Sequence, residues 1–90
     1  MARYIIKIWE TKDEREQGIS DIIESNLYDI QNTIEKAKKL AQSQNYNALE
    51  VQDTKQKITY YSYTPEGEKS FEDEIENAKI QEKINKYAIF

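Results

Sequence analysis

The sequence predicts one small α+β domain, with a three- to four-stranded sheet in β-α-β-β-α order and helices mainly on one face. Two segments, 3–10 and 48–63, alternate apolar and polar residues, which is the pattern of half-buried strands. Two others, 30–44 and 71–86, repeat apolar residues at the spacing of an amphipathic helix. A chain of 90 residues buries too little surface for two independent cores, so we expect a single domain.

The first expected strand covers residues 3–10 and presents two different faces. Tyr4, Ile6 and Ile8 share one face, and Ile5, Lys7 and Trp9 share the other. Residues 11–18 are mostly charged, so they form a solvated loop or a single helical turn ended by Gly18. Residues 19–24 are expected to form either a helical turn or a short strand. Their isoleucines have helical spacing, but Ser25 and Asn26, which follow, have a low helix propensity.

The central helix is expected to begin at Asp29 or Ile30 and to end near Gln44. Asp29 is a good N-cap, because its carboxylate can accept a hydrogen bond from a free N–H group of the first turn. Apolar residues then recur at helical spacing along one side of the segment, which is the side expected to face the core.

The second half of the chain is expected to continue with a hairpin and a last helix. Strands at 48–53 and 58–63 pair antiparallel across a short polar connection. The Thr-Pro-Glu-Gly run at 64–67 is the clearest turn in the sequence. The last helix runs from Phe71 towards Lys86.

Alternation divides the three tyrosines of the strand at 58–63 between the faces of the sheet. Tyr60 shares the core face with Ile58, whereas Tyr61 and Tyr63 join Trp9 on the other face. Because Trp and Tyr are enriched at binding hot spots, these three rings are a candidate partner-binding surface. The alternatives are strand-forming tyrosines on a solvated face and a stacking platform for single-stranded nucleic acid.

The last helix carries two apolar stripes on nearly opposite sides. Phe71, Ile75 and Ala78 form one stripe, and Ile80, Ile84 and Tyr87 form the other. Either the helix breaks near residues 77–81, or its second half packs against another molecule. The apolar end of the chain, residues 87–90, is a candidate docking segment within the single domain of residues 1–90. Self-association would then use Ile80, Ile84, Tyr87 and Phe90.

Acidic residues crowd the turn and the start of the last helix. The candidate partner-binding acids are Glu66, Glu68, Glu72, Asp73, Glu74 and Glu76. A second cluster contains Glu10, Asp13, Glu14, Glu16, Asp21 and Glu24. Acids in a first helical turn complement the helix dipole, which explains part of the first cluster. The remainder is either a solvated surface or an imitation of a phosphate backbone that attracts a basic protein.

Composition argues against several classes of function. The chain has 0 His and 0 Cys, so we expect no catalytic residues, no metal site, no cofactor and no enzymatic activity. A net charge of −4 argues against direct nucleic-acid binding, for which clustered Lys and Arg replace counterions. No apolar run is long enough to span a membrane and no signal-peptide core is present, so we expect a cytoplasmic protein.

The runs DIQNTIEKAKKLA, NALEVQD and KITYYSY resemble short proteins encoded by phages and plasmids of Gram-positive bacteria. The chain is similar in style to anti-CRISPR and anti-restriction proteins, which are commonly small, acidic and non-enzymatic. The resemblance implies an inhibitor or regulator of a nucleic-acid-handling protein. The alternative hypothesis is a structural module that self-associates, for example as a homodimer, and the third is a nucleic-acid binder.

Overall fold

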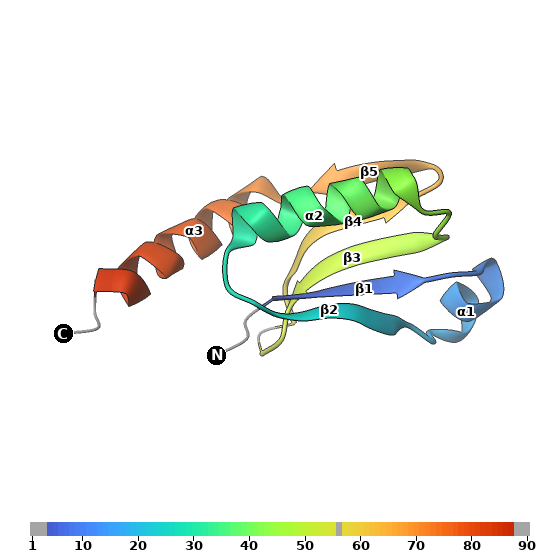
Figure 1. Cartoon of the computed structure of the whole chain (residues 1–90), viewed down its shortest axis with the longest axis horizontal. Helices are drawn as coiled ribbons and strands as arrows, with labels where there is room; N and C mark the ends of the chain where they lie inside the picture. Colours follow the sequence, from blue (N-terminus) through green and yellow to red (C-terminus); the bar gives the residue numbers. More distant parts are fainter. Residues whose placement is uncertain (1–3, 56, 88–90) are drawn as a thin grey trace.

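The computed structural model describes residues 4–55 and 57–87, without the side chains of residues 26 and 85–87. Along these residues the chain forms β1 (Tyr4–Trp9), α1 (Lys12–Gln17), β2 (Asp21–Leu27), α2 (Ile30–Ser43), β3 (Ala48–Asp53), β4 (Thr59–Thr64), β5 (Gly67–Ser70) and α3 (Glu72–Tyr87). The strands form one antiparallel sheet in the order β2-β1-β3-β4-β5. The helix α2 lies over one face of the sheet, α3 extends away from one end of the sheet, and α1 lies at the other end (Figure 1).

The predicted α+β class is confirmed, but the predicted number of strands and order of elements are wrong. In the described residues the sheet has five strands rather than three or four. The order is β-α-β-α-β-β-β-α rather than β-α-β-β-α. The additional elements are α1, β2 and β5, and each forms for a separate physical reason.

The short helix α1 is fixed at both of its ends. At its start the Thr11 side chain accepts a hydrogen bond from the Glu14 N–H at 3.1 Å, and the Glu14 carboxylate accepts one from the Thr11 N–H at 3.1 Å. This reciprocal pair is a capping box. At its end Gly18 has φ 73°, a left-handed conformation that costs glycine little. The helical alternative for residues 11–18 is therefore confirmed.

Residues 21–27 form an edge strand, which decides between the alternatives that the sequence left open. Its antiparallel partners in β1 are Leu27 with Tyr4, Glu24 with Ile6, Ile22 with Lys7, and Asp21 with Ile8. The register shifts twice along this pairing, so β2 follows β1 only with bulges. Backbone pairing to the open edge of β1 outweighs the helical spacing of the isoleucines, because that spacing reflects a weak local preference.

The strand β5 was not predicted, because its four residues are polar and lack an apolar alternation. It follows the turn at 64–67, where Gly67 has φ 152°, a conformation that side-chain-bearing residues rarely adopt. Backbone pairing then aligns Glu68 with Tyr63 and Ser70 with Tyr61. The turn thus sends the chain back along β4 instead of leading directly into the last helix.

The hydrophobic core lies between α2 and one face of the sheet. The buried residues of α2 are Ile30, Thr33, Ile34, Ala37 and Ala41, and they join Tyr4, Ile6, Ile8, Leu49 and Val51 of β1 and β3. The predicted N-cap is confirmed, because the Asp29 carboxylate accepts a hydrogen bond from the Asn32 N–H at 3.0 Å. The hydroxyl of buried Thr33 donates to the Asp29 carbonyl at 2.7 Å, so this polar group is satisfied inside the core.

A bulge in β4 places two consecutive tyrosines in the core. Val51 pairs with Tyr61 but Gln52 pairs with Thr59, so Tyr60 is the additional residue. Tyr61 lies on the covered face with its partner Val51 and is 0% exposed. Tyr60 packs edge-on against Tyr4, with ring centroids 5.5 Å apart. Strict alternation would have put Tyr61 on the opposite face, and that prediction is wrong.

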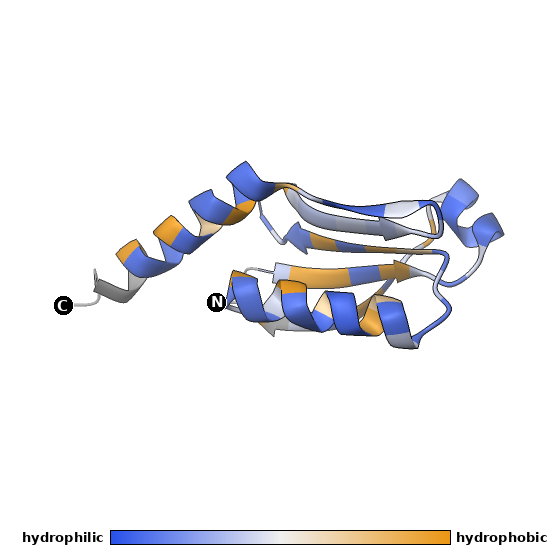
Figure 2. Cartoon of the chain, turned by 90° about the horizontal axis from the view of Figure 1, so that it is seen from above, coloured by the Kyte–Doolittle hydropathy of each residue, from blue (hydrophilic) through white to orange (hydrophobic). Residues whose placement is uncertain are grey.

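The last helix is continuous through residues 77–81, so it does not break where its apolar stripes change sides. Its inner side, Ile75 and Ala78, is buried against the core. The helix extends away from one end of the sheet (Figures 1 and 2), and the molecule measures 48 × 20 × 20 Å. Figure 2 shows that apolar residues continue along this projecting part.

A carboxylate connects the projecting part of α3 to two other elements. Glu82 follows Ala78 by four residues and therefore lies on the same inner side. Its Oε2 atom accepts a hydrogen bond from the Ile30 N–H at 2.8 Å and another from the Tyr4 hydroxyl. Glu82 thus joins α3 to the start of α2 and to β1, and its negative charge lies at the positive end of the α2 dipole.

We expect Glu82→Ala to lower the free energy of unfolding by about 1–3 kcal/mol, because the substitution removes an acceptor for two partly buried donors. Urea denaturation followed by circular dichroism measures this change. The matched control is Gln81→Ala, at an exposed position of the same helix, for which a change below about 0.5 kcal/mol is expected. Equal effects of the two substitutions would contradict a structural role for the Glu82 carboxylate.

Candidate interaction surfaces

The predicted aromatic surface does not exist as one face. Tyr61 and Tyr63 align with Val51 and Leu49 and lie on the side that the helices cover. Trp9 is the cross-strand partner of Ala48 on the other side of the sheet. The prediction that Trp9, Tyr61 and Tyr63 share an exposed face is therefore wrong, because the bulge in β4 reverses the expected alternation for the two tyrosines.

The surroundings of Tyr61 are those of a buried core residue rather than those of a ring on a binding surface. Its hydroxyl donates a hydrogen bond to Glu68, and the Lys38 ammonium lies 5.8 Å from its ring centre. Burial first, and then the hydrogen bond to Glu68, raise the pKa of the Tyr61 hydroxyl well above its usual range. The protonated hydroxyl therefore adds to the free energy of unfolding at pH values below about 10, which is the pKa of tyrosine in the unfolded chain. This contribution is lost as the pH rises further.

The candidate acids divide into two separate groups. Glu66 lies in the β4–β5 turn and Glu68 lies in β5, whereas the others begin α3. The strand β5, about 13 Å long at an ordinary rise per residue, separates Glu66 from the acids of α3. A hydrogen bond from Thr64 is the largest cause that lowers the pKa of Glu66, and the charges of Lys12 and Arg15 add to it. The predicted cluster is thus not continuous.

Three carboxylates of the second acidic cluster come together at the start of α1. Oxygen atoms of Glu10, Glu14 and Asp21 lie within 4.8 Å of one another, which is close enough to share a cation. The Glu14 oxygen already accepts hydrogen bonds from the Thr11 N–H and, at 3.2 Å, from the Glu10 N–H. Glu10 and Asp21 are exposed. The position of Glu14 is therefore explained by the capping of α1.

The outer face of α3 brings together acidic and apolar residues that the sequence analysis treated separately. This face consists of Asp73, Glu76, Ile80 and Ile84. At about 100° per residue these positions lie opposite the buried Ala78. All four are exposed, and Ile80 and Ile84 are 48% and 52% exposed. The spacing of three, four and four residues was the signal that could have grouped them.

Two of the residues predicted for self-association, Tyr87 and Phe90, have side chains outside the described part of the structure. The backbone of Tyr87 ends α3, but its side chain lies outside the described part of the structure. Phe90 and the rest of the predicted docking segment at 87–90 also fall outside the described residues. The outer face of α3 therefore consists of Asp73, Glu76, Ile80 and Ile84.

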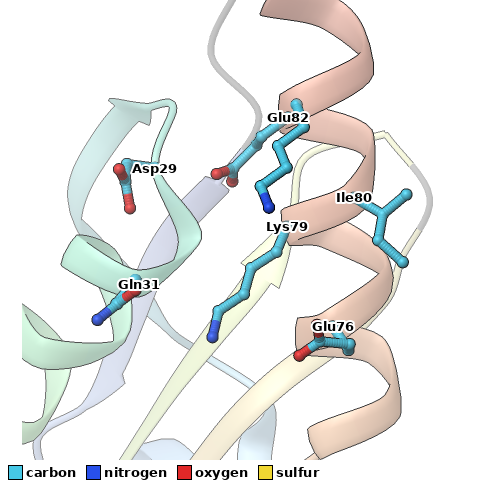
Figure 3. Close-up of a pocket in the computed structure, with 7 residues that line it drawn as sticks. Asp29, Gln31, Glu76, Lys79, Ile80 and Glu82 are labelled. Atoms are coloured by element: carbon cyan, nitrogen blue, oxygen red, sulfur yellow. The ribbon is translucent and has the colours of Figure 1, made fainter.

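A cleft of about 400 Å³ lies between the start of α2 and α3. It is lined by Asp29, Gln31, Glu76, Lys79, Ile80, Glu82 and Lys83. In Figure 3 Glu82 points towards the start of α2, Lys79 extends along the cleft, and Ile80 points away from α2. The lining mixes both charges, with carboxylates from Asp29, Glu76 and Glu82 and ammonium groups from Lys79 and Lys83.

No family model, curated protein or solved structure matches the chain. In the part of the chain that the structure describes, none of the helices has the length and apolar character needed to cross a membrane. The surfaces of the chain itself, above all the outer face of α3, are therefore the basis for a functional proposal.

We expect Tyr61→Ala to lower the free energy of unfolding by about 3–5 kcal/mol, the usual cost of removing a buried aromatic ring. Tyr28→Ala is the matched control, because Tyr28 is 57% exposed and its removal should cost less than about 1 kcal/mol. Thermal and urea denaturation of both variants provide the comparison. A small effect of Tyr61→Ala would contradict the burial of this ring and would support the exposed position that alternation predicted.

Proposed function

We propose that the chain is a non-enzymatic protein-interaction domain that binds a basic protein through the outer face of α3. The observation that supports this proposal is the position of Ile80 and Ile84, which are half exposed on a helix that projects from the body of the molecule. Exposed apolar side chains grouped on one side of a helix are typical of a surface that docks into a partner's groove.

The acidic end of the same face favours a partner with positive charge. Asp73 and Glu76 precede the two isoleucines along the outer face and are exposed, and Glu72 lies beside them in the first turn. Carboxylates at the rim of an apolar contact attract Lys and Arg and speed the encounter of the two molecules. We infer a groove with an apolar floor and a basic rim.

The partner that we propose is a nucleic-acid-handling protein, which the chain would inhibit or regulate in the cytoplasm. Such proteins carry basic grooves for the phosphate backbone, and an acidic helix would compete for the same charges. The resemblance to anti-CRISPR and anti-restriction proteins supports this choice, since those proteins are commonly small and acidic.

Self-association through α3 is the second candidate, and the same exposed isoleucines favour it. In an antiparallel pair that packs Ile80 of one copy on Ile84 of the other, the symmetry axis passes near residue 82. The Lys83 side chains of the two copies then lie about 3 Å apart along the helix axis, at a rise of about 1.5 Å per residue. This repulsion between like charges adds a small cost to the homodimer that is absent from a complex with a basic partner.

Direct nucleic-acid binding is the weakest proposal. Among the described residues, the uncovered face of the sheet carries a single aromatic ring, Trp9, because Tyr61 and Tyr63 lie on the covered face. A platform for single-stranded nucleic acid stacks successive bases on several rings and surrounds them with positive charge.

We expect Asp73→Lys combined with Glu76→Lys to reduce capture of a basic protein from an extract of the producing cells by about tenfold or more. The chain would be immobilised and the captured proteins quantified by mass spectrometry at low and high salt. Reversing two exposed acids elsewhere, with Glu16→Lys and Glu35→Lys, changes the net charge equally and should retain capture. The same loss in both variants would mean that net charge, rather than α3, controls binding.

Light scattering across a dilution series should give the mass of a monomer at every concentration. The physical reason is the juxtaposition of Lys83 side chains in the antiparallel pair described above. A dimer that becomes a monomer in Ile84→Glu, but not in the control Glu35→Lys, would instead support self-association.

A further inference from the structure

The helix α3 has two parts that differ in how they contact the rest of the molecule. In the first part, Ile75 is 7% exposed and Ala78 is 2% exposed, so both pack into the core. In the second part, Ile80, Gln81, Lys83 and Ile84 are exposed. Among the described side chains of α3, the apolar contacts with the core therefore end at Ala78.

Among the side chains that the structure describes, Glu82 attaches the second part to the body of the molecule. It continues the inner side of Ile75 and Ala78, but it presents a carboxylate where an apolar side chain would be expected. That carboxylate accepts the hydrogen bonds from the Ile30 N–H and the Tyr4 hydroxyl. The contact is polar, half buried and beside an open cleft, so water can replace it at a lower cost than it could replace a buried apolar contact.

The groups around Glu82 make its release possible without unfolding of α2. On α2, Asp29 caps the helix independently through the Asn32 N–H. On α3, Lys79 and Lys83 line the same cleft, and Lys79 lies three residues before Glu82, where it can pair with the released carboxylate. The Asp29 carboxylate also lines the cleft, and its negative charge opposes that of Glu82.

We propose that Glu82 is a releasable latch. The part of α3 that follows Ala78 separates from the start of α2 and returns to it through bending or partial unwinding of the helix, while the sheet, α2 and the first part of α3 remain folded. This goes beyond the proposed function and does not depend on it, because the motion belongs to the free molecule. In the closed position the latch fixes the direction in which Ile80 and Ile84 project.

Spin labels at two introduced cysteines test the latch, and the absence of natural cysteine makes the labelling specific. Glu35→Cys places one label on the exposed side of α2, and Ile84→Cys places the other on the projecting part of α3. We expect one narrow distance distribution in the parent chain. Adding Glu82→Ala should shift roughly a third or more of the population to a broad, longer distribution, whereas Gln81→Ala should leave it narrow.

An unchanged distribution in folded Glu82→Ala would overturn the proposal, since the apolar contacts of α3 would then suffice. Broadening by Gln81→Ala to the same extent would also overturn it, because the helix end would be fraying without a latch. Amide exchange in the unsubstituted chain decides the case in which Glu82→Ala fails to fold. We expect the Ile30 amide to exchange at least about tenfold faster than the Leu49 amide of β3, and equal rates would overturn the latch.

Discussion

Burial of one face of the sheet beneath α2 and the start of α3 is the constraint on which the rest of the structure depends. The main hydrophobic cluster lies at this interface, and β1, β3 and β4 all contribute to it. The strand β4 departs from regular pairing with β3, and this departure increases burial. The bulge in β4 brings Tyr60 as well as Tyr61 into the cluster, and the hydroxyl of buried Tyr60 is satisfied by Asp53 at 3.1 Å.

This constraint explains which parts of the structure could be predicted from the sequence. The first strand, the central helix and the last helix were predicted nearly to their ends, because each carries a regular apolar pattern or a recognisable cap. The positions of Tyr61 and β5 could not be derived in the same way. A bulge changes the face of a residue without a strong local signal, and β5 is held by backbone pairing to β4 rather than by its own side chains.

The candidate site was predicted only as separate pieces. The sequence indicated both the acidic start of the last helix and its second apolar stripe. Their combination on one outer face required knowing that the helix is continuous and that its inner side is buried through Ala78. Glu82 was missed because a single acid among many in a charged helix gives no sign that it contacts residues 52 and 78 positions away. Long-range hydrogen bonds of this kind depend on the tertiary arrangement.

The edges of the sheet have a consequence for the growth of larger assemblies. A regular edge strand offers unpaired backbone groups that another chain can extend. Here β2 is shifted twice against β1 and carries Asp21 and Glu24, while β5 at the other edge is only four residues long. Both edges are poor templates for an incoming strand. Continuous addition of molecules through backbone pairing is therefore disfavoured, and the projecting helix is left as the element best suited to a contact of limited size.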